Sequence, residues 1–455
     1  MGRDFNELVQ KYNVAAPRYT SYPTVPYWET ETWNTEQWIN HVQSTFFQSS
    51  GLNGEGISLY VHLPFCEHLC TYCGCNTHIT KNHKLEDPYI TAVLREWQLY
   101  KQVLGSAIPI SELHLGGGTP TFFNPHQLQR LINGLLDGNR VTDEASFSFE
   151  AHPANTTEMH LQVLYDAGFR RLSLGIQDFD PDVQRVINRR QTEADVWRVI
   201  DQARAIGYSS INFDLIYGLP LQTLDRIADT VAKVLVMRPD RISFYSYAHV
   251  PWMKPGQRLF TEGDLPRGND KLALYQLGRQ LILDAGYHDV GMDHFALAGD
   301  GLFKSAAAGN LHRNFMGYTE RYTPLLIGLG VSSISDAWFS FAQNVKELET
   351  YHAYIQEYKF PLIKGHVLTV EDLVLRRHIL DIMCRGLTVL GNPAAPDADV
   401  LRRLRPMQDD GLITIHGPEV QVTATGRSFL RNICMAFDQR LASGGNKSGL
   451  FSQSI

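Results

Sequence analysis

The chain lacks several features that would define its class at once. Its 455 residues include 41 Lys and Arg against 48 Asp and Glu, a formal net charge of -7 at pH 7. A sequence-independent nucleic-acid binder needs a basic surface to neutralise phosphates, so we expect no nucleic-acid partner. No stretch reaches the ~18 uninterrupted apolar residues of a membrane span, and the polar first ten residues do not resemble a signal peptide. We therefore expect a globular cytoplasmic protein without a membrane partner.

Cysteine is also scarce, but its distribution is uneven. Four of the six cysteines lie in one run, Cys66-Glu-His-Leu-Cys70-Thr-Tyr-Cys73-Gly-Cys75. In a reducing compartment such a run indicates metal binding rather than disulfide bonding. Three thiolates at the spacing of Cys66, Cys70 and Cys73 can hold three corners of a [4Fe–4S] cube. The fourth iron would then have no protein ligand and would be open to chemistry.

A structural zinc site is the alternative interpretation of this run. His62, His68 or His78 could complete a tetrahedron around zinc with the cysteines. Zinc fingers usually offer two ligand pairs separated by a loop, and the sequence contains no distant second pair. The spacing therefore favours an iron–sulfur cluster, while a zinc-stabilised protein without catalysis stays open.

Short strand-like runs alternate with longer helical patterns between residues 57 and 245. We predict strands at 57–63, 112–115, 146–151, 171–176, 211–216 and 241–245, and helices at 88–103, 125–136, 158–168, 193–206 and 224–236. A repeated βα unit favours a parallel sheet with right-handed crossovers. The sequence therefore predicts an α/β fold with a partial (β/α)6-type barrel.

Distinctive residues follow the ends of five predicted strands. The cysteine run follows the first strand, Gly116-Gly-Gly-Thr-Pro120 follows the second, and Glu150 closes the third. Gln177 follows the fourth strand and Asp214 lies near the end of the fifth. Functional groups in barrels of this kind lie beyond the carboxyl ends of the strands. We expect these residues to share one mouth of the barrel.

Two regions lie outside the repeat, so we expect an N-terminal arm (1–55), a barrel (56–341) and a smaller α+β C-terminal domain (342–455). The arm contains Pro17-Arg-Tyr-Thr-Ser-Tyr-Pro23-Thr24, whose bracketing prolines favour irregular structure. In the C-terminal domain we predict strands at 409–415 and 419–423, joined by a turn, beside helices at 370–383 and 426–441.

Several motifs together resemble one family. The pattern Cys66-x3-Cys70-x2-Cys73, with Tyr72 before the third cysteine, is similar to the cluster motif of the radical S-adenosylmethionine (SAM) superfamily. The wider set resembles the oxygen-independent coproporphyrinogen III oxidases: the arm at 17–24, the extension to Cys75, Gly116-Gly-Gly-Thr-Pro, Gly291-Met-Asp-His-Phe, His312-Arg-Asn-Phe-x-Gly-Tyr and Arg431-Asn-Ile-Cys-Met. This resemblance runs from about Tyr12 to Asp438.

The resemblance implies radical chemistry at the open iron. In the superfamily that iron chelates SAM, and the reduced cluster splits it into methionine and a 5′-deoxyadenosyl radical. This step needs the strongly reducing end of the range of Fe–S potentials. In the family the radical takes a hydrogen from a propionate of coproporphyrinogen III, and loss of CO2 and one electron leaves a vinyl group. A second round gives protoporphyrinogen IX for haem biosynthesis, with an electron donor and acceptor that the sequence does not identify.

The resemblance also implies residues that contact two SAM molecules. For the first SAM they are Tyr60, Gly117, Glu150 and Ile334; for the second they are Tyr72, Gly118, Thr119, Gln177, Arg189, Asp214 and Ala248. Glycines let backbone amides approach a ligand closely, and a carboxylate such as Glu150 can pair with a cation or bind hydroxyls. Taken without the family, Arg189 would be an exposed cation at a helix end.

A tetra-anionic tetrapyrrole must be bound by local positive charge, because the whole chain is acidic. Arg18 and Arg313 are candidate carboxylate partners, since guanidinium binds carboxylate through two hydrogen bonds. Cys75 belongs to the family signature without ligating the cluster, so we expect a buried thiol or a group near the substrate. A related haem-binding chaperone has an aromatic residue at that place, and Cys75 and the arm favour the oxidase. No repeated apolar surface stripe demands a partner, so we expect a monomer.

Overall fold

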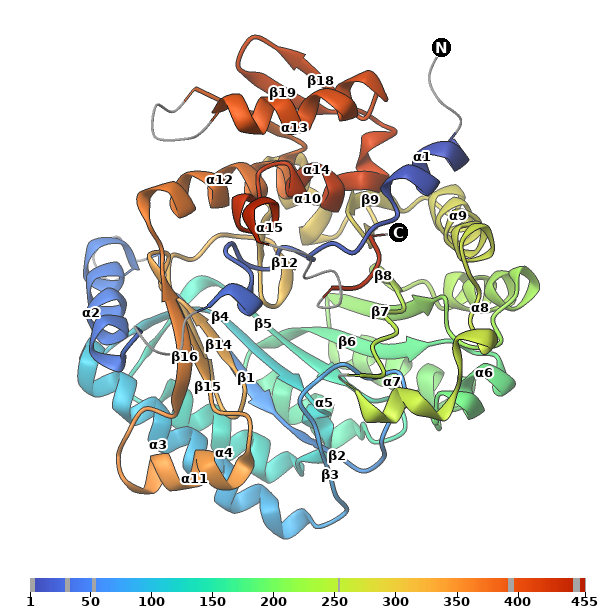
Figure 1. Cartoon of the computed structure of the whole chain (residues 1–455). Coiled ribbons are helices and arrows are strands. Elements are labelled where there is room, and N and C mark those ends of the chain that lie inside the picture. Colours follow the sequence, from blue (N-terminus) through green and yellow to red (C-terminus); the bar gives the residue numbers. More distant parts are fainter. Residues whose placement is uncertain are drawn as a thin grey trace.

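The computed structural model describes residues 5–28, 33–50, 55–252, 254–391, 397–444 and 451–454. Its centre is a curved sheet of twelve strands in the order β16-β15-β14-β13-β1-β4-β5-β6-β7-β8-β10-β9 (Figure 1). Neighbours are parallel from β13 to β8 and antiparallel at both edges. The parallel strands are β13 (Leu326–Leu329), β1 (Ile57–Leu63), β4 (Pro109–Gly117), β5 (Arg140–Ala151), β6 (Phe169–Gln177), β7 (Ser210–Tyr217) and β8 (Arg241–Ser246).

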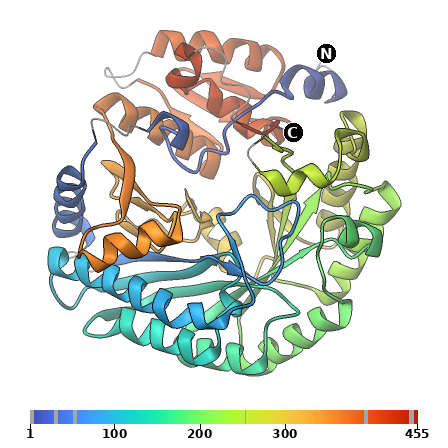
Figure 2. The same cartoon turned by 60° about the horizontal axis from the view of Figure 1, so that its bottom comes forward.

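Helices cover the outer, convex face of this sheet (Figure 2). They are α3 (Glu86–Leu104), α4 (Pro125–Leu136), α5 (Glu158–Asp166), α7 (Glu193–Ile206), α8 (Leu224–Met237) and α9 (Asn269–Asp284). The predicted partial barrel is confirmed, and all six predicted strands and five predicted helices are present. The short helix α6 (Pro181–Val186) is not among the predicted helices. Its first turn is capped by the carboxylate of Asp180. Asp followed by Pro is the signal that marks this start.

The remaining elements are short or lie at the edges. The antiparallel strands of the sheet are β9 (His288–Gly291), β10 (His294–Ala296), β14 (Ile334–Asp336), β15 (Ser340–Asn344) and β16 (Leu362–Val367). Two hairpin strands are β11 (His312–Asn314) and β12 (Gly317–Thr319), and the other helices are α2 (Thr35–Thr45), α10 (Gly301–Ala307) and α11 (Leu348–Gln356). Helical turns are η1 (Val25–Tyr27), η2 (Phe46–Ser50), η3 (His83–Leu85), η4 (Pro120–Phe122), η5 (Pro255–Leu259) and η6 (Glu262–Asp264).

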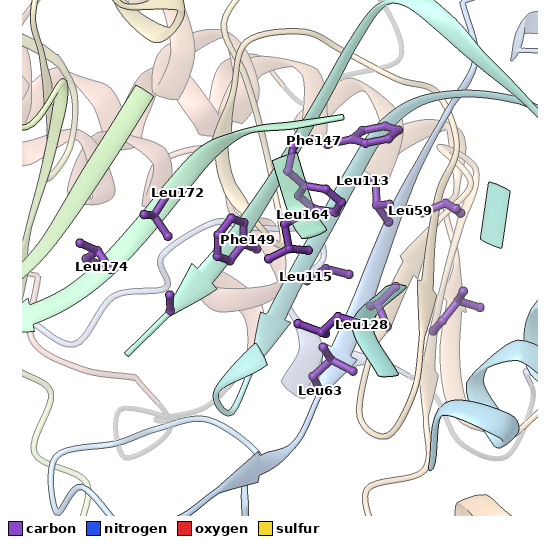
Figure 3. Packing of buried hydrophobic residues seen from close by; sticks show 14 of the residues in the cluster. Leu59, Leu63, Leu113, Leu115, Leu128, Phe147, Phe149, Leu164, Leu172 and Leu174 are labelled. Carbon is purple, nitrogen blue, oxygen red and sulfur yellow. The ribbon is translucent and has the colours of Figure 1, made fainter. Parts of the chain in front are cut away.

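Alternate residues of the parallel strands pack against the helices. Figure 3 shows one row of these side chains, from Leu59 on β1 to Leu174 on β6, with Leu128 of α4 and Leu164 of α5 packed on them. All of the labelled side chains are buried. Since side chains of a strand alternate between its faces, this packing turns the intervening residues toward the barrel interior.

The residues that face the interior are mostly polar. They include Ser58, Tyr60 and His62 on β1; Glu112 and His114 on β4; Ser148 and Glu150 on β5; Arg171 and Ser173 on β6; Asn212 and Asp214 on β7; and Arg241, Ser243 and Tyr245 on β8. At the amino-terminal end of the strands they form ion pairs: Arg171 contacts Glu320 at 3.0 Å, and Arg241 contacts Asp300 at 2.7 Å and also Glu320. The interior is therefore polar from one end to the other.

The C-terminal domain packs on the arm and not only on the barrel. Its elements are α12 (Val370–Arg385), β17 (Leu387–Val389), α13 (Asp397–Asp409), β18 (Ile413–His416), β19 (Glu419–Val422), η7 (Gly426–Phe429), α14 (Leu430–Met435) and α15 (Gln439–Ser443). Its apolar core includes Leu8, Val9 and Tyr12 of α1 (Phe5–Tyr12), together with Tyr19 and Tyr22 of the irregular arm. The arm thus completes a core formed by residues hundreds of positions away.

Two predictions for this domain are wrong in detail. The helix predicted at 426–441 is divided into η7, α14 and α15: α14 ends at Met435, and Asp438 caps the start of α15 by accepting from the Leu441 amide at 2.9 Å. The strand predicted from residue 409 begins only at Ile413, because Asp409 still belongs to α13 and Gly411 makes a turn with φ 73°. A boundary at 341 would cut β15 in two, so we propose that the C-terminal unit begins after Val367.

A buried carboxylate, Glu96 of α3, anchors the turn between β13 and β14. It accepts hydrogen bonds from the Gly330 amide at 2.8 Å, from Asn344 at 2.6 Å and from the Tyr351 hydroxyl at 2.7 Å. Burial raises the pKa of Glu96 to about 7, against the effect of these three donors. The turn it holds leads directly to Ile334 of β14.

Glu96 predicts a pH dependence of stability. A carboxyl whose pKa is raised in the folded state contributes stability that is present below about pH 4.5 and is lost as the pH rises through 7. Between pH 5 and pH 8 we expect the unfolding free energy of the wild type to fall by up to ~3 kcal/mol relative to Glu96→Gln. Anaerobic urea unfolding of both proteins at the two pH values measures the difference. Equal pH slopes would contradict the assignment.

Candidate active site

The cysteine run forms a loop whose two ends are tied together. Strand β2 (Phe65–Cys66) pairs in parallel with β3 (His78–Ile79), and the amide of Thr80 donates to the Cys66 carbonyl at 2.9 Å. The middle of the loop is held from the side, because Asn188 donates to the Leu69 carbonyl at 2.7 Å. The loop is thus fixed at both ends and at its centre.

A cavity of about 790 Å³ lies against this loop at the carboxyl ends of the strands. Of the residues expected in the site, those that line it are Cys66, Cys70, Tyr72, Cys73, Cys75, Gly117, Gly118, Thr119, Glu150, Gln177, Arg189 and Asp214. They come from five consecutive strands of the sheet and from the segments that follow them. The structure therefore brings together residues that the sequence spreads over about 150 positions.

The thiols of the loop differ in environment. Burial raises the pKa of Cys66 to about 11, and its sulfur lies 3.3 Å from the Thr119 hydroxyl. A hydrogen bond from the Cys75 side chain lowers the pKa of Cys73 to about 6, and the Cys75 amide also donates to the Cys73 sulfur at 3.4 Å. Donors to a ligating sulfur tune the potential of an iron–sulfur cluster. Cys75 is exposed in the loop and acts here on a neighbouring thiol.

The spacing of the three cysteines is that of the cluster motif of the radical SAM superfamily. Among the described residues no three His, Cys, Asp or Glu side chains are grouped as the ligands of one metal ion would be. Zinc ligands lie only about 4 Å from one another, because each Zn–S bond is ~2.3 Å long, whereas cluster cysteines bind separate irons. His62 is not free to ligate, since its ring contacts the Asn76 carbonyl at 2.8 Å and the Tyr60 hydroxyl at 3.1 Å. Cys66, Cys70 and Cys73 would hold the cluster.

Gly118 lies directly against the backbone that leads into the loop. A Cβ at this position would be 2.6 Å from the carbonyl of Pro64, so no other residue fits without a backbone shift. Its amide donates to the Leu63 carbonyl at 2.8 Å, and the next amide, of Thr119, donates to Phe65 at 3.0 Å. The glycine run is thus a close contact between β4 and the cysteine loop and not only a turn.

Glu150 is placed by the same run. The Gly117 amide donates to its carboxylate at 3.1 Å, and His114 lies 3.5 Å from its other oxygen. Burial alone would raise the pKa of Glu150, but these two donors bring it below its usual value. The carboxylate is therefore ionised at neutral pH and is available to a cation or to hydroxyls at the cavity wall.

Arg189 is buried, with 9% of its surface exposed, so its interpretation as an exposed helix-end cation is wrong. Its guanidinium lies 3.8 Å from the Cys70 sulfur and donates to the Gly175 carbonyl and to Gln191. The side chain turns inward because the Gly175 carbonyl, which accepts from it, lies near the end of β6. A fixed positive charge therefore lies beside one of the three cysteines of the motif.

Gln177 and Asp214 line the cavity at the ends of β6 and β7. Gln177 has a φ of 67°, a conformation that a residue with a side chain rarely adopts. Asp214 accepts from Ser173 at 2.8 Å and from Asn212 at 2.9 Å, while burial raises its pKa. Strain of this kind is concentrated at functional sites.

Three expected SAM contacts do not line the cavity among the described residues. Tyr60 is stacked on His114, with ring centroids 5.9 Å apart, directly behind Glu150. Ile334 packs with Trp28 and Phe341. The Ala248 carbonyl accepts a hydrogen bond from Gln257 at 3.1 Å.

The two candidate substrate residues, Arg18 and Arg313, lie side by side although 295 positions separate them. Arg313 donates through two nitrogens to the Arg18 carbonyl, at 3.3 and 3.4 Å. Arg18 forms an ion pair with Asp293 and lies over the ring of Tyr245, which lines the cavity. Neither arginine itself lines the cavity. Tyr245, which Arg18 contacts, lies between this pair and the cavity.

Sequence reasoning missed His152 and Tyr245, which both line the cavity. Burial, with the nearby charge of Arg189, lowers the pKa of His152 to about 2, so its ring is neutral. Both residues stand at the end of a predicted strand, His152 two positions after Glu150. The rule that located the other candidates, a polar residue at a strand end, would have found them.

Comparison with known proteins agrees with this site. The family model of the radical SAM superfamily matches residues 60–234, which hold the loop and four of the strand ends. The oxygen-independent coproporphyrinogen III oxidase of Escherichia coli (strain K12) is 38% identical over 444 residues, 95% of each chain. The enzymes of that name from Pseudomonas aeruginosa and Synechocystis sp. are 36% and 35% identical, over 96% and 99% of this chain and 96% and 97% of theirs.

The chain belongs to the oxygen-independent coproporphyrinogen III oxidase family. A solved structure of coproporphyrinogen III oxidase (HemN) from Escherichia coli, described as a radical SAM enzyme, superposes with a TM-score of 0.86 at 36% identity, covering 96% of this chain and 99% of that one. The cofactors of such enzymes are a [4Fe–4S] cluster and SAM. None of the helices described by the structure is both long and apolar enough to cross a membrane.

The loop geometry predicts that only three cysteines are ligands. After anaerobic reconstitution we expect Cys75→Ser to retain about four irons per chain, as the wild type does, and Cys70→Ser to lose most of them. Iron and acid-labile sulfide analysis measures both. Loss of iron in Cys75→Ser would make Cys75 a ligand, and zinc without iron in the wild type would contradict the cluster.

Proposed function

We propose that this protein converts two propionate side chains of coproporphyrinogen III to vinyl groups, giving protoporphyrinogen IX in haem biosynthesis without oxygen. Each conversion removes one hydrogen atom from a β-carbon, releases the carboxylate as CO2, and passes one electron to an acceptor. The bound cluster and SAM would supply the 5′-deoxyadenosyl radical that takes the hydrogen atom. The observation that carries the proposal is the three-cysteine loop at the mouth of a polar barrel in a chain of this family.

The chain's own residues have separate tasks in this proposal. Cys66, Cys70 and Cys73 would hold the cluster, and the ionised Glu150 would bind the polar end of SAM beside the Gly117 amide. The cavity wall then holds the substrate carbon close to the reacting group and excludes water. Gln177 and Asp214 also line the cavity and suit a second SAM, since both can bind hydroxyls.

A region of positive charge beside Tyr245 supports binding of a tetra-anion. Arg18 forms an ion pair with Asp293, and the charges of Arg18 and Arg431 both act on Lys271. Burial and the neighbouring Arg431 lower the pKa of Lys271 to about 8, and burial with Arg18 lowers the pKa of Arg431 to about 10. Cations that destabilise one another in this way are stabilised by an added anion. A protein of net charge -7 thus has a local group of cations that would attract an anion.

We further propose that the protein acts as a cytoplasmic monomer, with a separate electron donor for the cluster and a separate acceptor for the last electron. None of the six cysteines, which all lie in the described part of the chain, forms a disulfide, and this suits a reducing compartment. The balanced reaction requires both partners, because one electron enters with each SAM cleavage and one leaves with each vinyl group.

The function is tested with the reconstituted protein under anaerobic conditions. Incubation with SAM, a strong reductant, an electron acceptor and coproporphyrinogen III should give a divinyl product, CO2 and 5′-deoxyadenosine. An intact cluster that cleaves SAM but gives no vinyl product would refute the oxidase. Transfer of bound haem in place of turnover would instead identify the related haem chaperone.

The positive region predicts a defect in substrate binding. We expect Arg18→Ala to raise the KM for coproporphyrinogen III about tenfold or more, the effect of losing one charge-assisted hydrogen bond. Arg313→Ala should act in the same direction, because Arg313 supports the Arg18 carbonyl. The control is Arg130→Ala, an arginine paired with Asp87 at 2.9 Å on the outer helices. An unchanged KM in Arg18→Ala would remove Arg18 from the substrate site.

A further inference from the structure

Gln257 joins two parts of the site that are far apart in the sequence. It lies on η5, in the connection between β8 and α9, and only 1% of its surface is exposed. Its side-chain nitrogen donates to the Tyr72 carbonyl at 3.2 Å and to the Ala248 carbonyl at 3.1 Å. Its oxygen accepts from the Val250 amide at 2.6 Å. Both donor hydrogens of one buried amide are therefore used, one on the cysteine loop and one within the connection.

The two carbonyls belong to residues with a special place in the site. Tyr72 directly precedes Cys73, one of the three cluster cysteines, and lines the cavity. Ala248 follows β8 and is one of the residues expected at the second SAM. A displacement of the connection would therefore move the backbone on which Cys73 is placed.

A second contact joins the same two segments on the other side of Cys73. The ammonium of Lys254 donates to the Cys75 carbonyl at 3.1 Å. Gly256, next to Gln257, lies against the loop as well, since a Cβ there would be 3.4 Å from the side chain of Leu69. The connection thus forms hydrogen bonds to the loop at Tyr72 and at Cys75, one on each side of Cys73.

We propose that Gln257 is a positioning residue that fixes the wall at Ala248 relative to Cys73, and so couples the second SAM position to the cluster. This proposal rests on the proposed function for the identity of the two SAM positions. The side chain must be an amide of this length. In Gln257→Glu a carboxylate oxygen would face the two carbonyls in place of the donor nitrogen. In Gln257→Leu the three backbone groups would lose their hydrogen bonds to residue 257.

The chain offers a matched control in Gln222. This buried glutamine also accepts from one backbone amide, of Leu219 at 2.9 Å, and donates twice, to the Ile216 carbonyl at 2.8 Å and to Asp178 at 2.6 Å. It lies after β7, and its three hydrogen bonds go to Leu219, Ile216 and Asp178 and not to the backbone of the cysteine loop. Gln222→Leu therefore removes the same number of hydrogen bonds without touching Cys73.

The first readout is hydrogen–deuterium exchange of the full-length reconstituted protein. In Gln257→Leu and Gln257→Glu we expect residues 70–76 to exchange about fivefold faster or more, since a region exchanges faster when its hydrogen bonds are lost. In Gln222→Leu the same residues should exchange as in the wild type. The proposal would be overturned if residues 70–76 exchanged equally fast in Gln257→Leu and the wild type. It would also be overturned if Gln257→Leu and Gln222→Leu lost the same protection in residues 70–76.

The second readout is the coupling of SAM cleavage to product. Gln257→Leu and Gln257→Glu should retain the iron content of the wild type, because all three ligands remain, but should form several-fold more 5′-deoxyadenosine per vinyl group. An unchanged ratio in both would overturn the coupling role. If the wild type forms no vinyl product, the proposed function fails, and the exchange experiment still decides whether Gln257 positions the loop.

Discussion

The site depends on the alternation of side chains along the parallel strands. Apolar residues such as Leu113, Phe149 and Leu174 are buried under the outer helices, and each such burial stabilises the fold by about 1.5–3 kcal/mol. Side chains of a strand alternate between its two faces, so the neighbours of these apolar residues face the other way. Glu150 and Asp214 therefore point into the barrel because their apolar neighbours are packed under the helices. A shift of register by one residue would exchange the two sets and would place the charges against the helices.

Much of this could be predicted from the sequence, and the parts that could not have a physical reason. The strands, the helices and the strand-end residues follow from local periodicity, which is a property of neighbouring residues. Arg189 was misjudged because its partners, Cys70 and Gly175, are brought to it only by the fold. The division of the last helix at Asp438 was missed because apolar residues continue on both sides, and the capping carboxylate alone marks the break.

The distribution of charge shows the same difference between local and spatial information. The chain as a whole is acidic, yet the charges of Arg18 and Arg431, from distant parts of the sequence, both act on Lys271. No window of the sequence is basic enough to reveal this region. In the proposed function such a local field would steer an anion to one end of the site, while the net negative charge acts against indiscriminate binding of polyanions elsewhere.

The arm is held in place by residues from the other end of the chain. Arg431 donates to the carbonyls of Ala16 and Pro17 across 414 positions, and the amide of Ala16 donates to Ser452 at 3.0 Å. During synthesis the arm leaves the ribosome first, and these partners are made last. The barrel and its cysteine loop can therefore form while the arm is still unattached. The arm can therefore take its final place only after residue 452 has been made.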